Sequence, residues 1–120
     1  MDHDKAVELA AKAAHEFNNL YCQGIGDPPS PPWEALTGAQ HKGILEGAQA
    51  VLEGRSDAER HEGWMRVRAA EGWTYGTEKS FDKRTSPIMV PYDQLPARQR
   101  AKNANFRAVV LQMFTALEQA

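Results

Sequence analysis

Cysteine is almost absent from this 120-residue chain, which has only Cys22 and therefore no internal disulfide. Such a composition is typical of proteins kept in a reducing compartment. The chain also lacks any run of roughly 18 apolar residues that could span a membrane. Its first residues, Met1-Asp2-His3-Asp4, are not a basic region leading into an apolar signal sequence. We therefore expect a soluble, cytoplasmic protein without a membrane partner.

Signatures of enzymes and metal sites are missing as well. The pairs His15-Glu16 and His61-Glu62 are not followed by a second histidine at the spacing of a zinc protease. Gly24-Ile25-Gly26 follows a helical pattern rather than a strand, and no lysine-bearing phosphate loop occurs. The side chains that could ligate a metal form no cluster in the sequence: His3, His15, His41, His61 and Cys22. The sequence predicts a protein that is not an enzyme and has no metal or cofactor.

An excess of positive charge is also lacking. The net charge is −2, and a mildly acidic domain repels phosphates at long range, which argues against duplex nucleic acid as a partner. Residues 1–62 hold five Lys/Arg and eleven Asp/Glu, a balance of −6, whereas residues 79–107 hold seven against two, a balance of +5. The simplest interpretation is two solvated faces of opposite sign. The alternatives are an anionic ligand on the basic side, or head-to-tail pairing of two molecules.

Residues 5–22 are predicted to form an amphipathic helix, which begins at Asp2 or Asp4 and ends at Gly24 and Gly26. The helical spacing of its apolar residues defines the expected inward face. That face carries Ala6, Leu9, Ala10, Ala13, Phe17, Leu20 and Tyr21.

The prolines among residues 27–32 exclude a helix there, because they lack amide donors and force extended dihedrals. Trp33 and Leu36 follow directly. We therefore expect residues 28–36 to form a rigid strap that Trp33 pins to the core. The alternatives are a linker or a ligand for a polyproline-binding module.

Two capping boxes, Thr37 to Gln40 and Ser56 to Glu59, predict helices over residues 37–53 and 56–70. A final helix, over residues 103–118, has the most regular apolar spacing. We expect it to be buried at the centre of the fold through Phe106, Val109, Val110, Met113, Phe114 and Leu117.

Short extended segments at residues 73–76 and 88–91 complete the pattern. The predicted fold is mostly α, a single domain over residues 1–120 with about four helices and a small two-stranded β element. It begins with a helical region at residues 1–27 and the proline strap at residues 28–36. We expect no internal repeat.

The third predicted helix carries a candidate site. His61, Trp64 and Arg68 are spaced by three and four residues and so form one stripe. The stripe lies beside the face of Met65, which we take as the contact with the core. An indole next to an imidazole and a guanidinium suits a flat heteroaromatic ring with negative charge nearby. The alternative is that Trp64 is a core residue, which Arg68 shields from water.

Several short motifs occur in order along the chain: Pro31-Pro32-Trp33, His61-Glu62-Gly63-Trp64, Gly72-Trp73-Thr74-Tyr75-Gly76 and Pro87-Ile88-Met89-Val90-Pro91-Tyr92-Asp93-Gln94-Leu95-Pro96. With these motifs the chain resembles the RyR domain, the repeat domain of ryanodine receptors, which also occurs as short stand-alone proteins in bacteria and their phages. The resemblance implies a mostly helical module with Trp73 and Tyr75 in its core. It places the signature region at residues 56–118.

The resemblance also implies a function. In ryanodine receptors the repeats form tandem pairs, and the tryptophan that corresponds to Trp64 lines the cleft between them, where an adenine nucleotide or a planar drug-like ligand stacks. Arg68 matches a basic residue one turn later, and Lys83 and Arg84 are candidates for a second phosphate contact. Because this chain has one such repeat, and Ile88 stands where some repeats carry a basic residue, a complete cleft needs a homodimer.

The leading hypothesis is a non-enzymatic module that binds a planar, anionic small molecule such as a nucleotide derivative. The resemblance implies sensing or sequestration of such a ligand in conflicts between bacteria and phages. The alternative is a structural or protein–protein interaction domain without a small ligand. Such a domain would dock a partner through the proline strap or the charged loop of residues 77–86.

Overall fold

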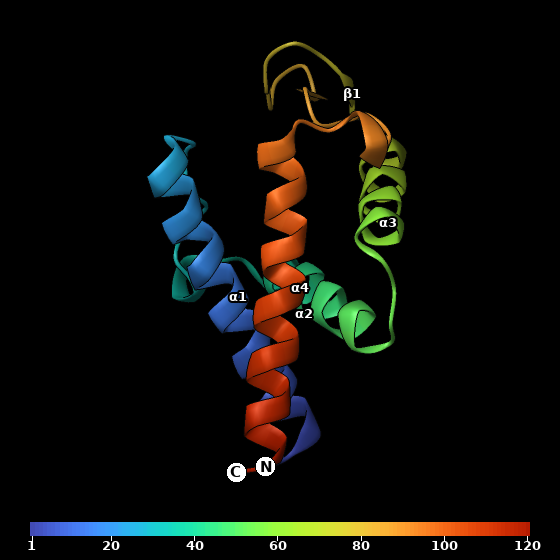
Figure 1. Cartoon of the computed structure of the whole chain (residues 1–120). Coiled ribbons are helices and arrows are strands. Elements are labelled where there is room, and N and C mark those ends of the chain that lie inside the picture. Colours follow the sequence, from blue (N-terminus) through green and yellow to red (C-terminus); the bar gives the residue numbers. More distant parts are fainter. The chain divides into compact units, whose positions relative to one another are not determined.

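A computed structural model describes all of residues 1–120, and helices form most of the chain (Figure 1). The elements in chain order are α1 (His3–Ile25), η1 (Trp33–Ala35), α2 (Gly38–Leu52), α3 (Asp57–Ala70), β1 (Thr74–Tyr75), β2 (Thr85–Ser86), η2 (Tyr92–Gln94) and α4 (Ala97–Glu118). The elements η1 and η2 are single 3-10 turns. The predicted fold class, mostly α with four helices and a two-stranded β element, is confirmed. None of the helices has the length and apolar character needed to cross a membrane.

The chain forms two compact units. Residues 1–55 and 102–120 make up the first, which we call the helical unit, and residues 56–101 make up the second, the signature unit. The helical unit contains α1, η1, α2 and most of α4. The signature unit contains α3, both strands and η2.

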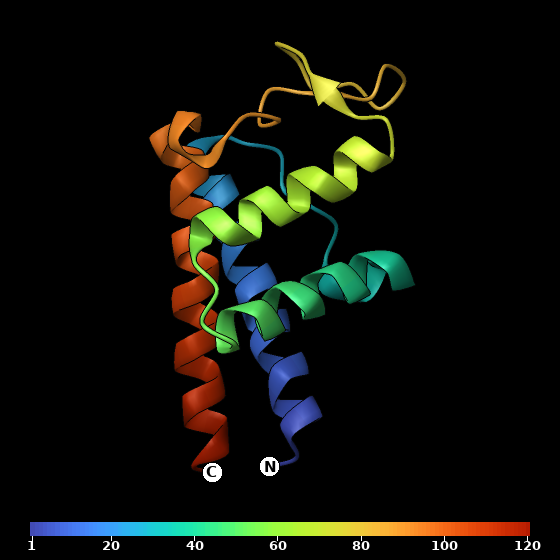
Figure 2. The same ribbon diagram turned by 90° about the vertical axis from the view of Figure 1, so that its right-hand side faces the viewer.

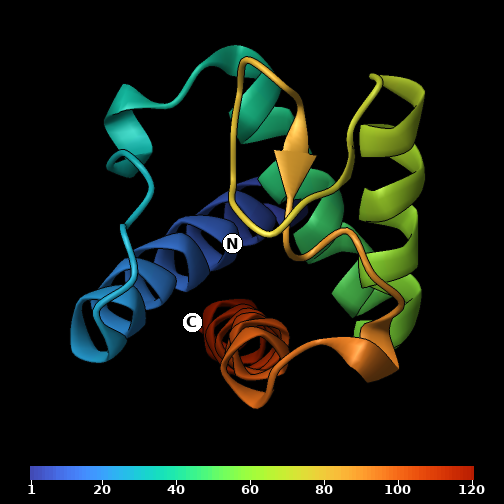
Figure 3. The same cartoon turned by 90° about the horizontal axis from the view of Figure 1, so that it is seen from above.

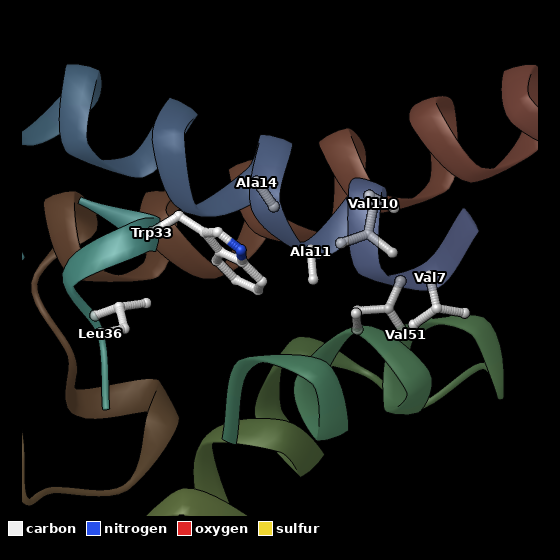
Figure 4. Packing of buried hydrophobic residues seen from close by; sticks show 9 residues of the cluster. Val7, Ala11, Ala14, Trp33, Leu36, Val51 and Val110 are labelled. Atoms are coloured by element: carbon white, nitrogen blue, oxygen red, sulfur yellow. The ribbon is translucent and has the colours of Figure 1, made fainter. Parts of the chain in front are cut away.

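Small side chains build much of the core of the helical unit. In this unit α1 and α4 run side by side in opposite directions, so both chain termini lie at the same end, and α2 crosses them (Figures 1 and 2). Val7 and Ala11 of α1 cluster with Val51 of α2 and Val110 of α4 (Figure 4). Such small residues let helices approach closely and pack without voids.

The helix α1 begins and ends as predicted but buries only part of the predicted face. Asp2 caps its start by accepting a hydrogen bond from the Lys5 amide at 3.1 Å, and Gly26 ends it with a φ of 79°. Of the predicted inward residues, Ala6 and Ala10 are fully buried, whereas Phe17 and Leu20 are 44% and 65% exposed. The buried face extends instead to Val7, Ala11 and Ala14. The prediction was wrong for Phe17 and Leu20 because the apolar surface of α1 is wider than the part that its neighbours cover.

The proline segment is a strap, as predicted, and Trp33 pins it to the core with 8% of its surface exposed. Asn19 of α1 holds Ser30 by two hydrogen bonds, both at 3.1 Å. The Ser30 backbone amide donates to the Asn19 side-chain oxygen, and the Asn19 side-chain amide donates to the Ser30 carbonyl. The Nε2 atoms of His15 and His41 donate to the carbonyls of Pro31 and Trp33 at 2.8 and 2.7 Å. These side chains satisfy backbone groups that a proline-rich segment cannot pair by itself.

The last helix is longer than predicted and less deeply buried. It begins at Ala97 rather than near residue 103, and Val110 is fully buried at its centre. Phe106, Val109 and Phe114 are partly buried against the core, and Leu117 is half-buried. Met113, expected inside, is 36% exposed. The six apolar residues of α4 do not all lie on its buried face. Those at the edge of that face stay in contact with solvent.

The signature unit begins with α3, which the predicted capping box of Ser56 and Glu59 starts. The long connection from α3 to α4 is seen from above in Figure 3. It contains β1 and β2, which pair in parallel through Thr74 with Thr85 and Tyr75 with Ser86. Gly76 allows this close approach, because a Cβ atom on it would lie 2.6 Å from the Cβ of Thr85. Tyr75, predicted as core, is 57% exposed, since a pair of two-residue strands has no second layer above it.

Candidate functional site

The stripe predicted on α3 is formed in the structure. The rings of His61 and Trp64 stack with centroids 5.6 Å apart and an interplanar angle of 23°. The guanidinium carbon of Arg68 lies 5.9 Å from the centroid of the Trp64 ring, within the range of a cation–π contact. Trp64 itself is half-buried. An indole is therefore held between an imidazole one turn earlier and a guanidinium one turn later, with part of its surface open to solvent.

His61 has an internal role in this arrangement. It is only 6% exposed, and its Nε2 donates a hydrogen bond to the Val90 carbonyl at 2.8 Å. Its ring also lies against Tyr92, at a centroid distance of 6.1 Å. Next to it, a Glu62 carboxylate oxygen accepts a hydrogen bond from the Tyr92 amide at 3.3 Å. His61 thus orients Trp64 and fastens the Pro91 segment to α3, rather than offering a polar atom to a ligand.

Arg68 and Arg84 both contact Glu71 at the end of α3. Arg68 Nη1 forms an ion pair with Glu71 Oε1 at 2.6 Å, and Arg84 Nη1 donates to the Glu71 carbonyl at 2.8 Å. Cations are favourable there because the C-terminus of a helix carries partial negative charge. The side chain of Arg68 is 40% exposed, so solvent weakens its pair with Glu71. An incoming anion can therefore compete with Glu71 for Arg68.

The remaining candidate, Lys83, lies beside Arg84 in the loop before β2. Its amide donates to the Ser80 hydroxyl at 3.2 Å, which tightens the turn. Arg84 adopts a positive φ of 53°, an uncommon backbone conformation for a residue other than glycine. The structure thus links Arg84 to the stripe through Glu71. Lys83 is the neighbour of Arg84 in sequence, and its backbone serves the turn before β2.

An aromatic surface in the signature unit escaped the sequence analysis. Phe81 is 74% exposed and meets the half-buried Trp73 edge to face at 5.7 Å. The ammonium of Lys79 lies 5.1 Å from the Phe81 ring centroid, and Tyr75 is exposed nearby in sequence. The signal was the density of aromatic residues between residues 73 and 81. The resemblance placed Trp73 and Tyr75 in the core, and Phe81 lies within the charged loop of residues 77–86.

The helical unit contains a shallow groove of about 430 Å³ between α1 and α2, lined among others by Asp4, Val7, His41 and Glu46. None of the predicted site residues lines it. No group of His, Cys, Asp and Glu side chains in residues 1–120 is arranged to hold a metal ion.

The attachment made by His61 occurs a second time in the molecule. In the helical unit His15 Nε2 reaches the Pro31 carbonyl at the same 2.8 Å, and His15 lies 6.1 Å from Trp33 at 60°. In the signature unit the rings of His61 and Tyr92 are also 6.1 Å apart, at 57°.

Both places share one sequence pattern, which we call the helix–strap motif. A His-Glu pair on a helix is followed, eleven residues after the histidine, by a glycine with positive φ, Gly26 at 79° and Gly72 at 91°. A proline, an aromatic residue, an acidic residue, any residue and a buried leucine then form a 3-10 turn, at residues 32–36 and 91–95. The expectation of no internal repeat was therefore wrong.

The family model of the RyR domain matches residues 40–120. The match covers α2, α3 and α4, and with them the whole second helix–strap motif and the stripe of His61, Trp64 and Arg68. The chain belongs to the RyR domain family. The first helix–strap motif, from His15 to Leu36, lies before the matched region.

Proposed function

We propose that this protein is a non-enzymatic binding module for a small, planar, anionic ligand such as a nucleotide derivative. The observation that carries the proposal is Trp64, a half-buried indole with an imidazole stacked against it and a guanidinium within 6 Å. Because His61 is itself fixed by Val90, the indole is oriented before a ligand arrives. A preorganised aromatic surface binds a planar ring at a low entropic cost.

The charges around Trp64 favour a ligand with an anionic group. A heteroaromatic ring on the open part of the indole brings its phosphate or carboxylate toward the end of α3, where Arg68 and Arg84 both contact Glu71. Arg68 then exchanges Glu71 for the anion in a charge-assisted hydrogen bond. Glu71 also limits the affinity for such a ligand, since its carboxylate repels an anion that does not displace it from Arg68.

A second candidate function, a protein–protein interaction module, is favoured by the aromatic surface of Tyr75 and Phe81. Exposed aromatic residues are typical of the central residues of protein interfaces. Phe81, at 74% exposure, has the character of such an anchor. In either case we propose a cytoplasmic protein whose working form is a weak homodimer.

A thermal-shift titration separates the two functions. Binding to the folded state alone raises the melting temperature by mass action, so we expect ATP and ADP to raise it, adenosine to raise it less, and inorganic phosphate alone to leave it unchanged. Trp64→Ala should abolish the shift, whereas Tyr75→Ala, the matched aromatic control, should retain it. If no nucleotide shifts the melting temperature of the parent, the interaction module replaces the ligand-binding function.

A further inference from the structure

The helix α1 has an apolar strip that no other part of the chain covers completely. Leu9, Ala13, Phe17 and Leu20 are spaced by four, four and three residues and fall within an arc of about 80° on a regular helix. Leu9 and Ala13 are half-buried, whereas Phe17 is 44% and Leu20 65% exposed. We call these four residues the outer strip. It is distinct from the buried face around Ala10 and Ala14 (Figure 4).

The outer strip is complementary to itself when a second α1 lies antiparallel against it. In the register that places Leu9 opposite Leu20 of the other copy, Phe17 falls beside Ala13, whose small side chain leaves room for the ring. Leu9 and Leu20 therefore face each other at both ends of the contact, and Phe17 meets Ala13 near its centre. This alternation is the condition for close packing between helices.

The charges on the border of the outer strip fit the same register. Lys12 and Glu16 lie on one edge of the strip, and in the antiparallel pair Glu16 of each copy approaches Lys12 of the other. Glu16 is exposed. Lys12 already bonds Glu34 at 3.1 Å, but an ammonium has three donors and its side chain is 37% exposed.

We propose that the outer strip of α1 is the interface through which two copies of this chain associate, with the two α1 helices antiparallel. The occupant is a second copy because both the apolar residues and the bordering charges match their own two-fold image. The proposal does not rest on ligand binding by Trp64. Trp33 takes no part in such a contact, since that indole is buried within its own chain.

Sedimentation equilibrium on the full chain, at low salt and over a range of micromolar concentrations, tests the proposal. We expect the mass to rise from 13.4 kDa toward twice that value with concentration. Leu20→Glu should raise the dissociation constant by about tenfold or more, because it places a charge in the apolar contact. Val67→Glu, which places the same charge on a comparably exposed apolar residue of the signature unit, should leave it unchanged.

A reciprocal charge exchange tests the register without touching the apolar residues. Glu16→Lys should weaken association by placing two lysines together, and Lys12→Glu combined with Glu16→Lys should restore it. Glu16 is exposed, and Lys12→Glu loses only a solvent-exposed ion pair with Glu34, so circular dichroism should show an intact fold. A parent that stays monomeric at the highest concentration would overturn the proposal. A dimer that Leu20→Glu and Glu16→Lys leave unaffected would overturn it equally, because association would then use another surface.

Discussion

The two helix–strap motifs have the same attachment but different surroundings. In both, a histidine donates to a strap carbonyl at 2.8 Å and lies 6.1 Å from an aromatic ring. The first connects its glycine to the strap proline through residues 27–31 and buries its aromatic residue, Trp33. The second uses residues 73–90 for the same connection and leaves its aromatic residue, Tyr92, half-exposed. One motif therefore completes a core, and the other supports a surface.

The residues three and seven positions after each histidine also differ between a buried and a surface environment. Asn18 and Cys22 stand in the first motif at the positions of Trp64 and Arg68 in the second, counted from the histidine. The Asn18 amide donates to the Cys22 sulfur at 3.8 Å, and Cys22 is buried. An internal polar contact thus takes the place of the indole and guanidinium. The comparison teaches that the motif is a scaffold, and that the side chains added to it decide whether it presents an indole and a guanidinium at its surface.

The two motifs should differ most in the free energy of unfolding that is lost when Trp33 or Tyr92 is replaced. Trp33→Ala should lower the free energy of unfolding by about 3–5 kcal/mol, because it leaves a cavity in the core. Tyr92→Ala should cost only about 1–2 kcal/mol, since that ring is half-exposed. Urea denaturation followed by circular dichroism measures both. Equal losses would mean that the second strap is as deeply packed as the first.

Replacing either histidine should lower the stability of the fold to a similar extent, but only one replacement should affect ligand binding. His15→Ala and His61→Ala should each cost about 1–3 kcal/mol, because a strap carbonyl loses its donor. Only His61→Ala should also weaken nucleotide binding, since Trp64 loses the ring that orients it. Denaturation and calorimetric titration separate the two effects. Weaker binding in His15→Ala as well would show that the effect arises from general destabilisation.

Arg68 should contribute to binding rather than to stability. Arg68→Ala should weaken anionic ligands by about 1 kcal/mol, because the gain from the ligand contact is reduced by the loss of the pair with Glu71. Uncharged nucleosides should bind almost as well as to the parent. Arg66→Ala, on an exposed position of the same helix, is the control. Equal losses for nucleosides and nucleotides would remove Arg68 from the anion site.

The smallest expected effect concerns the first strap, which Glu34 ties to α1 through Lys12. The hydrogen bond and charge of Lys12 lower the pKa of Glu34, and the same contact with Glu34 raises the pKa of Lys12. The contact therefore stabilises the fold when both groups are charged. Its contribution is lost as the pH falls through the lowered pKa of Glu34, or rises through the raised pKa of Lys12.

Glu34→Gln should accordingly lower the melting temperature slightly near neutral pH and have no effect in strong acid. Both side chains are exposed to solvent, so the change is small. Differential scanning calorimetry across the pH range measures it. Asp93→Asn, at the corresponding position of the second strap, is the matched control. A Glu34→Gln difference that persists unchanged into strong acid would rule out this ion pair as its source.

Local signals made much of the fold predictable from the sequence. The capping boxes of Thr37 and Ser56 and the stop at Gly26 act within a few residues, so each was found where expected. The stripe of His61, Trp64 and Arg68 follows from helical spacing alone. These features need no knowledge of what packs against them.

Features that depend on distant partners could not be predicted in the same way. Phe17 and Leu20 lie on one of two possible apolar faces of α1, and only the position of its neighbours decides which is buried. A histidine that donates to a carbonyl, such as His15 to Pro31, leaves no mark in the sequence. The repeated motif had a signal in its His-Glu pairs and following glycines. It was missed because the two connections differ in length.

That difference in length has a small thermodynamic cost. Closing a loop of eighteen residues, 73–90, instead of five, 27–31, costs about 1 kcal/mol more in chain entropy. The fixed ends, at Gly72 and at the Val90 carbonyl held by His61, are the same in kind as those of the short connection. Evolution can therefore lengthen, shorten or replace the segment between them without disturbing the helices, and a designer can graft a foreign peptide there.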